Sequence, residues 1–352
     1  MKWHSSIVVA LLSASVVVNG IPLGTTSCTV KSQRKAWHTL TKDEKLEYLD
    51  AEKCLMKLPA KLGLPGTRTR FDELQASHAM QAEITHGVGA FLPFHRLLMH
   101  THEYLMQTEC GYEGTQPYWD EPRDAGKFSK SVVLDPDVGF GGDGVAPDNC
   151  IADGPFVGYM NGIGPGHLIS DHCIDRKVND VASQAANQSF VDQCYKLQNY
   201  STAWPCMEGS PHSGGHGGIG AEMLNPISSP GDPIFYLHHT YLDKVWWGWQ
   251  ALNLPASVSE ITGRNVQDPC AGFGGGLPWT GPNGTSPFPG WPNGTIPGCE
   301  NDTTPVIPQS LPGDPGNVTT MNHVLNMFGI VPNSTVGDVL DIRNDFLCYE
   351  YV

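Results

Sequence analysis

The chain has 352 residues, enough for one large domain or two small ones, and carries 36 acidic against 21 basic side chains, a formal net charge of −15. This acidity makes nucleic acid and anionic membranes poor partners, and we attribute it to the solubility of an exported protein. Beyond the N-terminal segment no stretch approaches twenty consecutive apolar residues, so the sequence predicts no membrane span.

Residues 1–20 have the pattern of a secretory signal peptide. Lys2 gives a positive start, and the apolar run Ile7–Val18 is too short to span a membrane. Small residues precede Ile21, as a cleavage site requires. We therefore predict a secreted protein whose mature part, residues 21–352, forms one domain.

A scaffold helix is predicted over residues 41–58. Thr41-Lys42-Asp43-Glu44 resembles a capping box, and apolar residues follow it at near-helical spacing. Pro59 and the Gly63–Gly66 turn end the pattern. We assign no chemistry to this segment.

Three histidines in residues 71–110 can meet at one place. His78 lies in a strongly helical stretch, and His86 comes just before the probable break Gly87-Val88-Gly89. Pro93 suits the first turn of a new helix, because its missing N–H costs nothing there. His95 would then face inward from that helix. Two helices and a loop can thus bring three imidazoles together.

Glycines cluster between Gly139 and Gly144, in a loop-rich stretch. A phosphate-binding loop would need a preceding strand, a GK[ST] ending and a following helix, and none of these is present. We interpret the stretch as a surface loop. His167 and His172, which follow in a loop rich in Gly and Pro, are expected to be exposed.

A second group of histidines lies between Pro211 and Trp249. His212 and His216 are four residues apart, which stacks them on one helix face about one turn apart. The run Asp232–His239 opens another helix, and Asp243 lies one turn beyond His239, where its carboxylate could hold an imidazole N–H. Three imidazoles from two facing helices would make one metal site.

Residues 270–316 are rich in Gly, Pro and Asn, and we expect a glycosylated surface excursion closed by Cys270 or Cys299. In an exported protein, N-x-S/T sequons predict glycans on surface loops. The sequons are at Asn187, Asn199, Asn283, Asn293, Asn301, Asn317 and Asn333.

The ten cysteines all follow the signal peptide. An even number in an exported chain favours disulfides, and the absence of a C-x-x-C pair argues against zinc. Spacing does not give the connectivity. Cys28 and Cys348 lie near the two ends of the mature chain, and we expect them to pair.

The segment from Pro211 to Trp249 resembles the second copper motif of the tyrosinase and catechol oxidase family, the type-3 copper proteins. That motif runs H-x-x-x-H and then D-P-x-F-x-L-H-H-x-x-x-D, and every element is present. The resemblance implies that His212, His216 and His239 bind one copper. His238 would be a neighbour and not a ligand.

Residues His86 to Arg96 resemble the first copper motif of the same family, H-G-x-x-x-F-L-P-[WF]-H-R. The resemblance implies that His78, His86 and His95 hold the partner copper, so that the protein takes two copper ions per chain. Some members tether the second ligand by a thioether from a cysteine two residues earlier. Ile84 occupies that position here, so no such crosslink is expected.

His100 and His102 fall outside the family spacing, and we interpret them as surface residues or as neighbours of the site. Tyr118-Trp119-Asp120 resembles the family's P-Y-W-D/N scaffold element. Tyr349-Glu350-Tyr351 looks like the Y-x-Y motif that closes the catalytic core of longer members. The chain stops there and resembles the short fungal group, which has no C-terminal shielding domain.

Imidazole ligands suit copper chemistry because they serve both Cu(I) and Cu(II). The resemblance implies that the partners are O₂ and a small phenolic substrate, and that a catechol returns two electrons and leaves as an o-quinone. Glu208 and Asp243 are the nearest carboxylates in sequence that could act as a base.

Ser213 and Gly217 follow the first two implied ligands of the second copper, and Phe235 is a further candidate near the ligands or the substrate entrance. In the family, Asn at the first position is associated with strong monophenol hydroxylation. Serine orients water less firmly, so we expect diphenol oxidation to dominate, with weaker monophenol hydroxylation.

We therefore expect a mainly α fold in which a four-helix-bundle core carries a dinuclear copper site, with long loops and disulfides. The alternatives are a full tyrosinase, an o-aminophenol oxidase, an oxygen carrier of the haemocyanin type, and a secreted structural glycoprotein with incidental histidines. Nothing in the sequence indicates an oligomeric state.

Overall fold

A computed structural model describes residues 28–267 and 316–352 of the chain. The predicted signal peptide, Cys270, Cys299 and three of the sequons, Asn283, Asn293 and Asn301, lie outside these residues. Within the described part, no helix is both long and apolar enough to cross a membrane.

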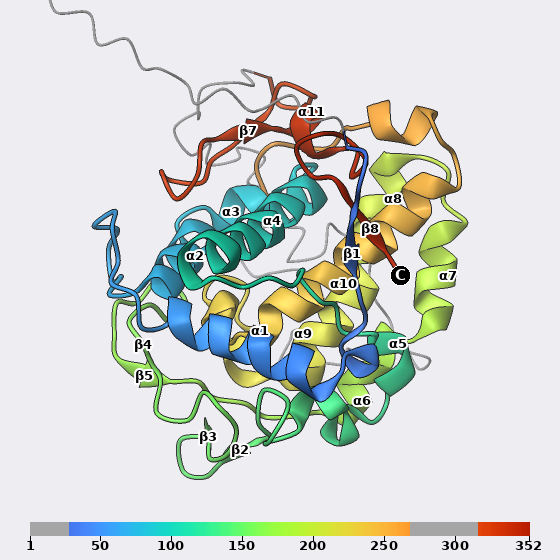
Figure 1. Ribbon diagram of the computed structural model, residues 1–352. Coiled ribbons are helices and arrows are strands. Elements are labelled where there is room, and N and C mark those ends of the chain that lie inside the picture. The colour runs from blue at the N-terminus through green and yellow to red at the C-terminus, as the bar shows by residue number, and fades with distance from the viewer. Residues whose placement is uncertain (1–27, 268–315) are drawn as a thin grey trace, which may run out of the picture.

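Helices make up most of the regular secondary structure in the described residues, and α4 and α10 are the two longest (Figure 1). The helices are α1 (Lys42–Leu55), α2 (Arg70–Ala79), α3 (Ala82–Thr85), α4 (Phe91–Cys110), α5 (Glu121–Asp124), α6 (Asp180–Ser183), α7 (Gln188–Tyr195), α8 (Tyr200–Met207), α9 (Ser213–Ile219), α10 (Ile234–Ala251) and α11 (Val336–Val339). The mainly α expectation is confirmed.

The strands are short and form two-stranded pairs. They are β1 (Ser32–Arg34) with β8 (Tyr349–Tyr351), β2 (Gly144–Val145) with β3 (Cys150–Ile151), β4 (Met160–Asn161) with β5 (His172–Cys173), and β6 (Val324–Leu325) with β7 (Ser334–Thr335). The β1–β8 pair is parallel and brings the two ends of the described chain side by side (Figure 1).

Local sequence explains where the main helices begin and end. The predicted capping box is present at α1, where Thr41 and Glu44 satisfy each other's backbone N–H groups, and Thr69 and Asp72 do the same for α2. Helix α4 begins at Phe91, so Pro93 lies in its first turn, where no N–H is needed. It ends where Gly111 turns left-handed (φ 69°), a conformation that glycine adopts readily.

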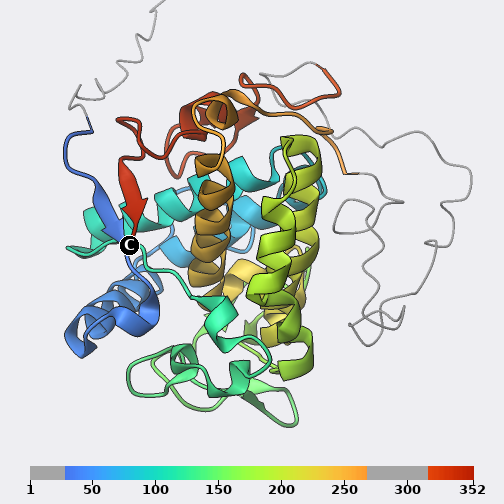
Figure 2. The same ribbon diagram turned by 90° about the vertical axis from the view of Figure 1, so that its right-hand side faces the viewer.

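The expected helical core is present, and four of its helices, α2, α4, α9 and α10, carry predicted ligands. Helices α4 and α10 pack against each other at the centre, and α7 and α8 stand beside α10 (Figure 2). Phe91 and Leu98 of α4 and Tyr236 and Trp246 of α10 are fully buried there. This packing fixes the two helices that carry His95 and His239.

Asp243 ties α10 to the closing strand. Its carboxylate accepts hydrogen bonds from Tyr349 (2.5 Å) and Tyr351 and from the guanidinium of Arg96 on α4. Arg34 of β1 lies 3.6 Å away from the same carboxylate. We predicted that Asp243 would hold an imidazole, and that prediction is wrong. Its described partners are two arginines and two tyrosines, because α10 turns this residue toward β8.

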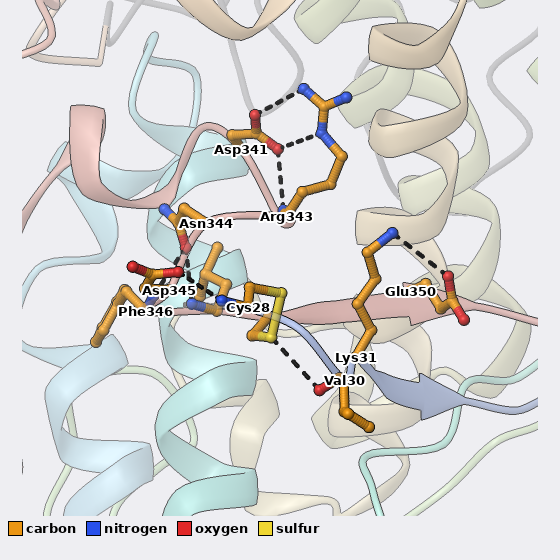
Figure 3. The surroundings of a disulfide bond; sticks show 11 residues. Cys28, Val30, Lys31, Asp341, Arg343, Asn344, Asp345, Phe346 and Glu350 are labelled. Atoms are coloured by element: carbon orange, nitrogen blue, oxygen red, sulfur yellow. Dashed lines mark hydrogen bonds and ion pairs between the residues drawn. A yellow bond between two sulfur atoms is a disulfide. The ribbon is translucent and has the colours of Figure 1, made fainter. Parts of the chain in front are cut away.

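Four disulfides link the described cysteines: Cys28–Cys348, Cys54–Cys110, Cys150–Cys173 and Cys194–Cys206. The expected pairing of Cys28 with Cys348 is confirmed. Around this bond the Cys28 N–H donates to Asp345, and Lys31 lies 3.5 Å from Glu350 (Figure 3). The disulfide therefore extends the β1–β8 pairing beyond the strands.

The four sequons in the described part differ in their exposure. Asn199, Asn317 and Asn333 are exposed. Asn187 is half-buried, and its side chain caps α7 by accepting from the Ser189 N–H. Glycosylation at these sites remains a prediction.

Candidate metal centre

The first predicted triplet comes together in the fold. His78 lies on α2, His86 follows α3, and His95 lies on α4. All three are buried, and one potential ligand atom from each lies within 4.8 Å of the others. The loop Gly87–Ala90 makes this possible, because it turns the chain back so that α4 starts beside His86.

The second triplet also comes together. His212 ends a π-helical turn (Glu208–His212), His216 lies on α9 and His239 lies on α10. Their potential ligand atoms lie within 4.8 Å of one another, and His238 belongs to the same group. The Nδ1 of His238 lies 2.5 Å from Oε1 of Glu121, so that nitrogen already has a partner.

The two groups face each other directly, and Phe235 packs against both. The rings of His95 and His239 are stacked with centroids 4.2 Å apart, and those of His86 and His212 are 6.3 Å apart. The fully buried Phe235 packs against His239 at 4.1 Å and against His78 at 5.3 Å. Phe235 thus lies between the imidazoles and not at an entrance. His212 and His216 are the most exposed of the six, at 8% each.

Backbone carbonyls orient five of the six imidazoles. A carbonyl can only accept, so each bonded Nδ1 carries the proton and Nε2 keeps the lone pair that a metal needs. The acceptors are Ala82 for His86, Phe91 for His95, Glu208 for His212, Ile227 for His78 and Met223 for His216.

The remaining nitrogens fit a metal. The Nε2 atoms of His78, His95 and His212 are buried without a hydrogen-bond partner, which is costly unless something binds them. The Nε2 atoms of His216 and His239 lie 3.2 Å apart. Six convergent imidazoles without a carboxylate form a donor set that suits copper.

Burial keeps these imidazoles neutral. It lowers the pKa of His86 to about 4 and holds the pKa of the other five well below the usual value, with neighbouring imidazoles adding to the effect in those five. Neutral imidazole is the form that binds metal. The metal-free site is therefore ready to bind at neutral pH.

Glu208, four residues before His212, places its carboxylate against the loop that follows His86. Its Oε1 accepts from the Gly87 N–H (2.8 Å), while Oε2 is buried without a hydrogen-bond partner. Burial raises the pKa of Glu208 to about 8, although the Gly87 N–H opposes this. Ser213 is partly buried and donates to the Glu208 carbonyl (3.0 Å), and Gly217 is buried in α9.

The helix α9, with sequence SGGHGGI, needs its glycines because other segments approach it closely. A Cβ on Gly215 would lie 2.2 Å from Nδ1 of His238 and 2.8 Å from Oε1 of Glu121. A Cβ on Gly214 would lie 2.4 Å from the backbone nitrogen of Ala186. The repeated glycines are the sequence signal that could have indicated this packing.

The other histidines lie outside the two groups. His102 is fully buried, 2.8 Å from Glu52, and stacks on Tyr236 at 3.8 Å, so it is a neighbour of the core and not a surface residue. His100 is partly exposed and packs against Phe346.

His167 and His172 were both expected to be exposed. His167 is exposed and lies 2.6 Å from Glu83. The expectation is wrong for His172, whose side chain is only 17% exposed because β5 packs it over Glu222.

Sequence reasoning missed the acidic partners of these histidines. Each of these histidines faces a glutamate that is distant in sequence, and no sequence motif predicts the pairing. The glutamates are Glu121, Glu52 and Glu222. It also missed the carbonyls of Met223 and Ile227, since every residue has a carbonyl and only the fold selects these two.

The mainly α core holds two facing histidine groups, an arrangement that fits a dinuclear metal site. The family model "Common central domain of tyrosinase" matches residues 68–252. The chain belongs to the tyrosinase family. It is an oxidoreductase of a family that acts on phenolic substrates with O₂, and membership implies copper.

Fungal proteins are among its relatives. A tyrosinase-like protein of Diaporthe leptostromiformis is 27% identical, over 92% of this chain and 80% of that protein. A tyrosinase of Aspergillus flavus is 28% identical, over 98% and 87%. An N-acetyl-6-hydroxytryptophan oxidase of Emericella nidulans is 27% identical, over 97% and 98%. A mutant polyphenol oxidase from Thermothelomyces thermophila shares the fold, with a TM-score of 0.70 and 26% identity over 92% of this chain and 89% of that one.

Proposed function

We propose that the protein is a secreted type-3 copper oxidase that converts o-diphenols to o-quinones with O₂ and hydroxylates monophenols more weakly. His78, His86 and His95 would hold one copper, and His212, His216 and His239 the other. The observation that carries this proposal is the pair of facing triplets with convergent ring nitrogens, in which backbone carbonyls hold Nδ1 of five of the six imidazoles.

When bound, a copper pair supplies the redox chemistry, because it cycles between Cu(I) and Cu(II). Two catechols give four electrons and four protons to one O₂, and the products are two o-quinones and two waters. The protein orients the imidazoles, keeps them neutral and limits the access of water to a site where the ligands are at most 8% exposed.

We assign the proton-accepting role to Glu208. Its free oxygen is buried next to the loop that carries His86, and its raised pKa of about 8 suits a group that takes and returns a proton near neutral pH. Ser213 already donates its hydroxyl hydrogen to a carbonyl, so it has only lone pairs left for a water. This supports weak monophenol hydroxylation.

His238 is not assigned to a copper, although it lies within reach of the second group. His239 is assigned instead, because its Nε2 lies 3.2 Å from that of His216 and because the family motif takes the second histidine of the pair as the ligand. We therefore keep His238 as a neighbour that packs against the ligands, with its ring 4.5 Å from that of His216.

Export is supported by the four disulfides, which form and persist in oxidising compartments. We propose cleavage of residues 1–20 and glycosylation of the exposed sequons. N-terminal sequencing of the protein recovered from culture medium should begin at Ile21, and treatment with an endoglycosidase should lower its mass.

The deciding experiment measures oxygen uptake by the copper-loaded protein with a catechol and with its matching monophenol. Rapid uptake with the catechol and a long lag with the monophenol would support the proposal. Prompt turnover of both would indicate a full tyrosinase, and preference for an o-aminophenol an aminophenol oxidase. Reversible oxygen binding without turnover would indicate a carrier.

A further inference from the structure

A short segment, Glu222–Ser228, contacts one histidine in each triplet. We name it the bridging segment. The carbonyl of Met223 accepts from Nδ1 of His216, and the carbonyl of Ile227 accepts from Nδ1 of His78 at 2.9 Å. The orientation of these two imidazoles thus depends on a segment outside their own helices.

The other carbonyl acceptors behave differently. Those of His86, His95 and His212 lie four residues earlier in the chain, so the local backbone turn supplies them automatically. The bridging segment has no such local origin. Its position relative to the two triplets has to be set by tertiary contacts.

An ion pair holds the start of the bridging segment. The Glu222 carboxylate is almost fully buried, and its Oε2 lies 3.4 Å from Nε2 of His172. The Glu222 N–H donates to the carboxylate of Asp175 at 3.1 Å. His172 lies on β5, which the Cys150–Cys173 disulfide anchors, and its Nδ1 bonds the Ser170 carbonyl at 3.0 Å.

The far end of the segment is held by neutral groups. The amide of Gln75, on α2 one turn before His78, donates to the Ser228 carbonyl at 2.9 Å. The Ser228 hydroxyl accepts from the Gly166 N–H at 3.0 Å. The charged contact of the segment is therefore at Glu222. Removing the partner of this buried carboxylate is expected to be strongly destabilising.

The charge on His172 is favoured in the fold. Burial opposes it, but the contacts with Glu222 and the Ser170 carbonyl outweigh burial and raise the pKa of His172. The nearby carboxylate of Asp175 acts in the same direction.

We propose that His172 and Glu222 are a positioning pair that sets the Met223 and Ile227 carbonyls, and through them the imidazoles of His216 and His78. Both metal positions then depend on one contact outside the centre. The proposal rests on the assignment of the two triplets as copper sites. It predicts that loss of the pair loosens both coppers together.

The test uses His172→Gln, Glu222→Gln and the double variant. His167→Gln is the matched control, because His167 lies in the same loop region and pairs with Glu83 instead. Transfer of copper from the reduced, loaded protein to a Cu(I) chelator is followed with time. We expect each single variant to release both coppers at least fivefold faster than the unmodified protein, the double variant no faster than the singles, and the control within twofold.

Release within twofold of the unmodified protein, faster release of one copper only, or equal acceleration in His167→Gln would each overturn the proposal. Amide exchange of Ile227 and Ser228 in the metal-free proteins gives a second readout, with α1 as the internal reference. It should be faster in His172→Gln, and no change would overturn the proposal. If the unmodified protein bound no copper, the proposed function would fail, while the exchange comparison would still test the pair.

Discussion

At the scale of single residues, Glu208 combines a free buried oxygen with a place beside the His86 loop. Glu208→Gln keeps its shape and removes its ability to accept a proton. Because general-base catalysis contributes typically about 10²–10⁴-fold, we expect monophenol hydroxylation to fall by about 100-fold or more, and catechol oxidation much less. Steady-state rates at matched copper content test this, and an equal loss with both substrates would contradict it.

The raised pKa of Glu208 also predicts a pH dependence for the metal-free protein. In the unfolded chain the carboxyl ionises near 4.5, whereas in the fold it stays protonated up to about 8. The folded state therefore binds more protons between these values, and stability falls as pH rises through this window. The loss from this group is on the order of 5 kcal/mol.

Urea unfolding of the metal-free protein at several pH values measures this dependence. In Glu208→Gln the corresponding part of the slope should disappear between pH 4.5 and 8. A variant whose stability declines with pH as steeply as the unmodified protein would show that Glu208 ionises normally in the fold.

Gly215 is the residue where a single methyl group should disturb the second triplet. Alanine there would press on His238 and Glu121, and overpacking of this kind costs about 1–3 kcal/mol. We expect Gly215→Ala to lower the unfolding midpoint and to weaken the second copper. Gly142→Ala is the control, since its Cβ would meet Asp153 at an ordinary 3.5 Å. Similar midpoints for both variants would refute the close approach.

At the scale of elements, Asp243 joins α10, α4, β1 and β8. Asp243→Asn would leave Arg34 and Arg96 buried without their shared negative partner, and breaking a buried ion pair in this way costs about 3–5 kcal/mol. Denaturant unfolding measures the cost. Asp341→Asn removes the partner of the more exposed Arg343 and should cost less than about 1 kcal/mol. Equal losses would mean that the Asp243 network does not hold the elements together.

An element could be predicted from the sequence when neighbouring residues determine it, and could not when packing against distant segments determines it. The α1 capping box, the Pro93 start of α4 and the spacing of His212 and His216 are short-range patterns, and the fold follows them. The orientation of α10 about its axis is not local. From the sequence alone, a carboxylate one turn beyond His239 could have faced the histidines. Packing of α10 against β8 instead turns Asp243 toward Tyr349.

The candidate site shows the same division. Five of its six histidines lie in the two motifs and His78 lies in the helical stretch before the first. Within the motifs, a single loop separates His86 from His95 and one helix turn separates His212 from His216. The environment of His172 and His102 depends on chain segments 50 residues away, Glu222 and Glu52. Burial of a histidine in a loop rich in glycine and proline has no sequence signal of its own.

At the scale of the whole molecule, the Cys28–Cys348 disulfide closes a loop with a sequence separation of 320. In the chain-entropy model, long loops give the larger stabilisation, about 4 kcal/mol or more, against about 3 kcal/mol for short ones. Replacing both cysteines with serine should therefore cost more than the same change at Cys194–Cys206, whose separation is 12. Chemical unfolding of the two double variants compares them, and the reverse order would contradict the prediction.

The Asp243 network also sets an order of events during synthesis. Tyr351 follows Asp243 by 108 residues, so α10 leaves the ribosome well before the strand that completes its surroundings. At about 5–20 residues per second the interval is on the order of 5 to 20 seconds. During that time Asp243 lacks the hydrogen bonds that the hydroxyls of Tyr349 and Tyr351 donate in the complete fold. A nascent chain that stalled between these points would carry all six histidines and yet lack the strand that completes the Asp243 network, and we expect chaperones to bind such a chain.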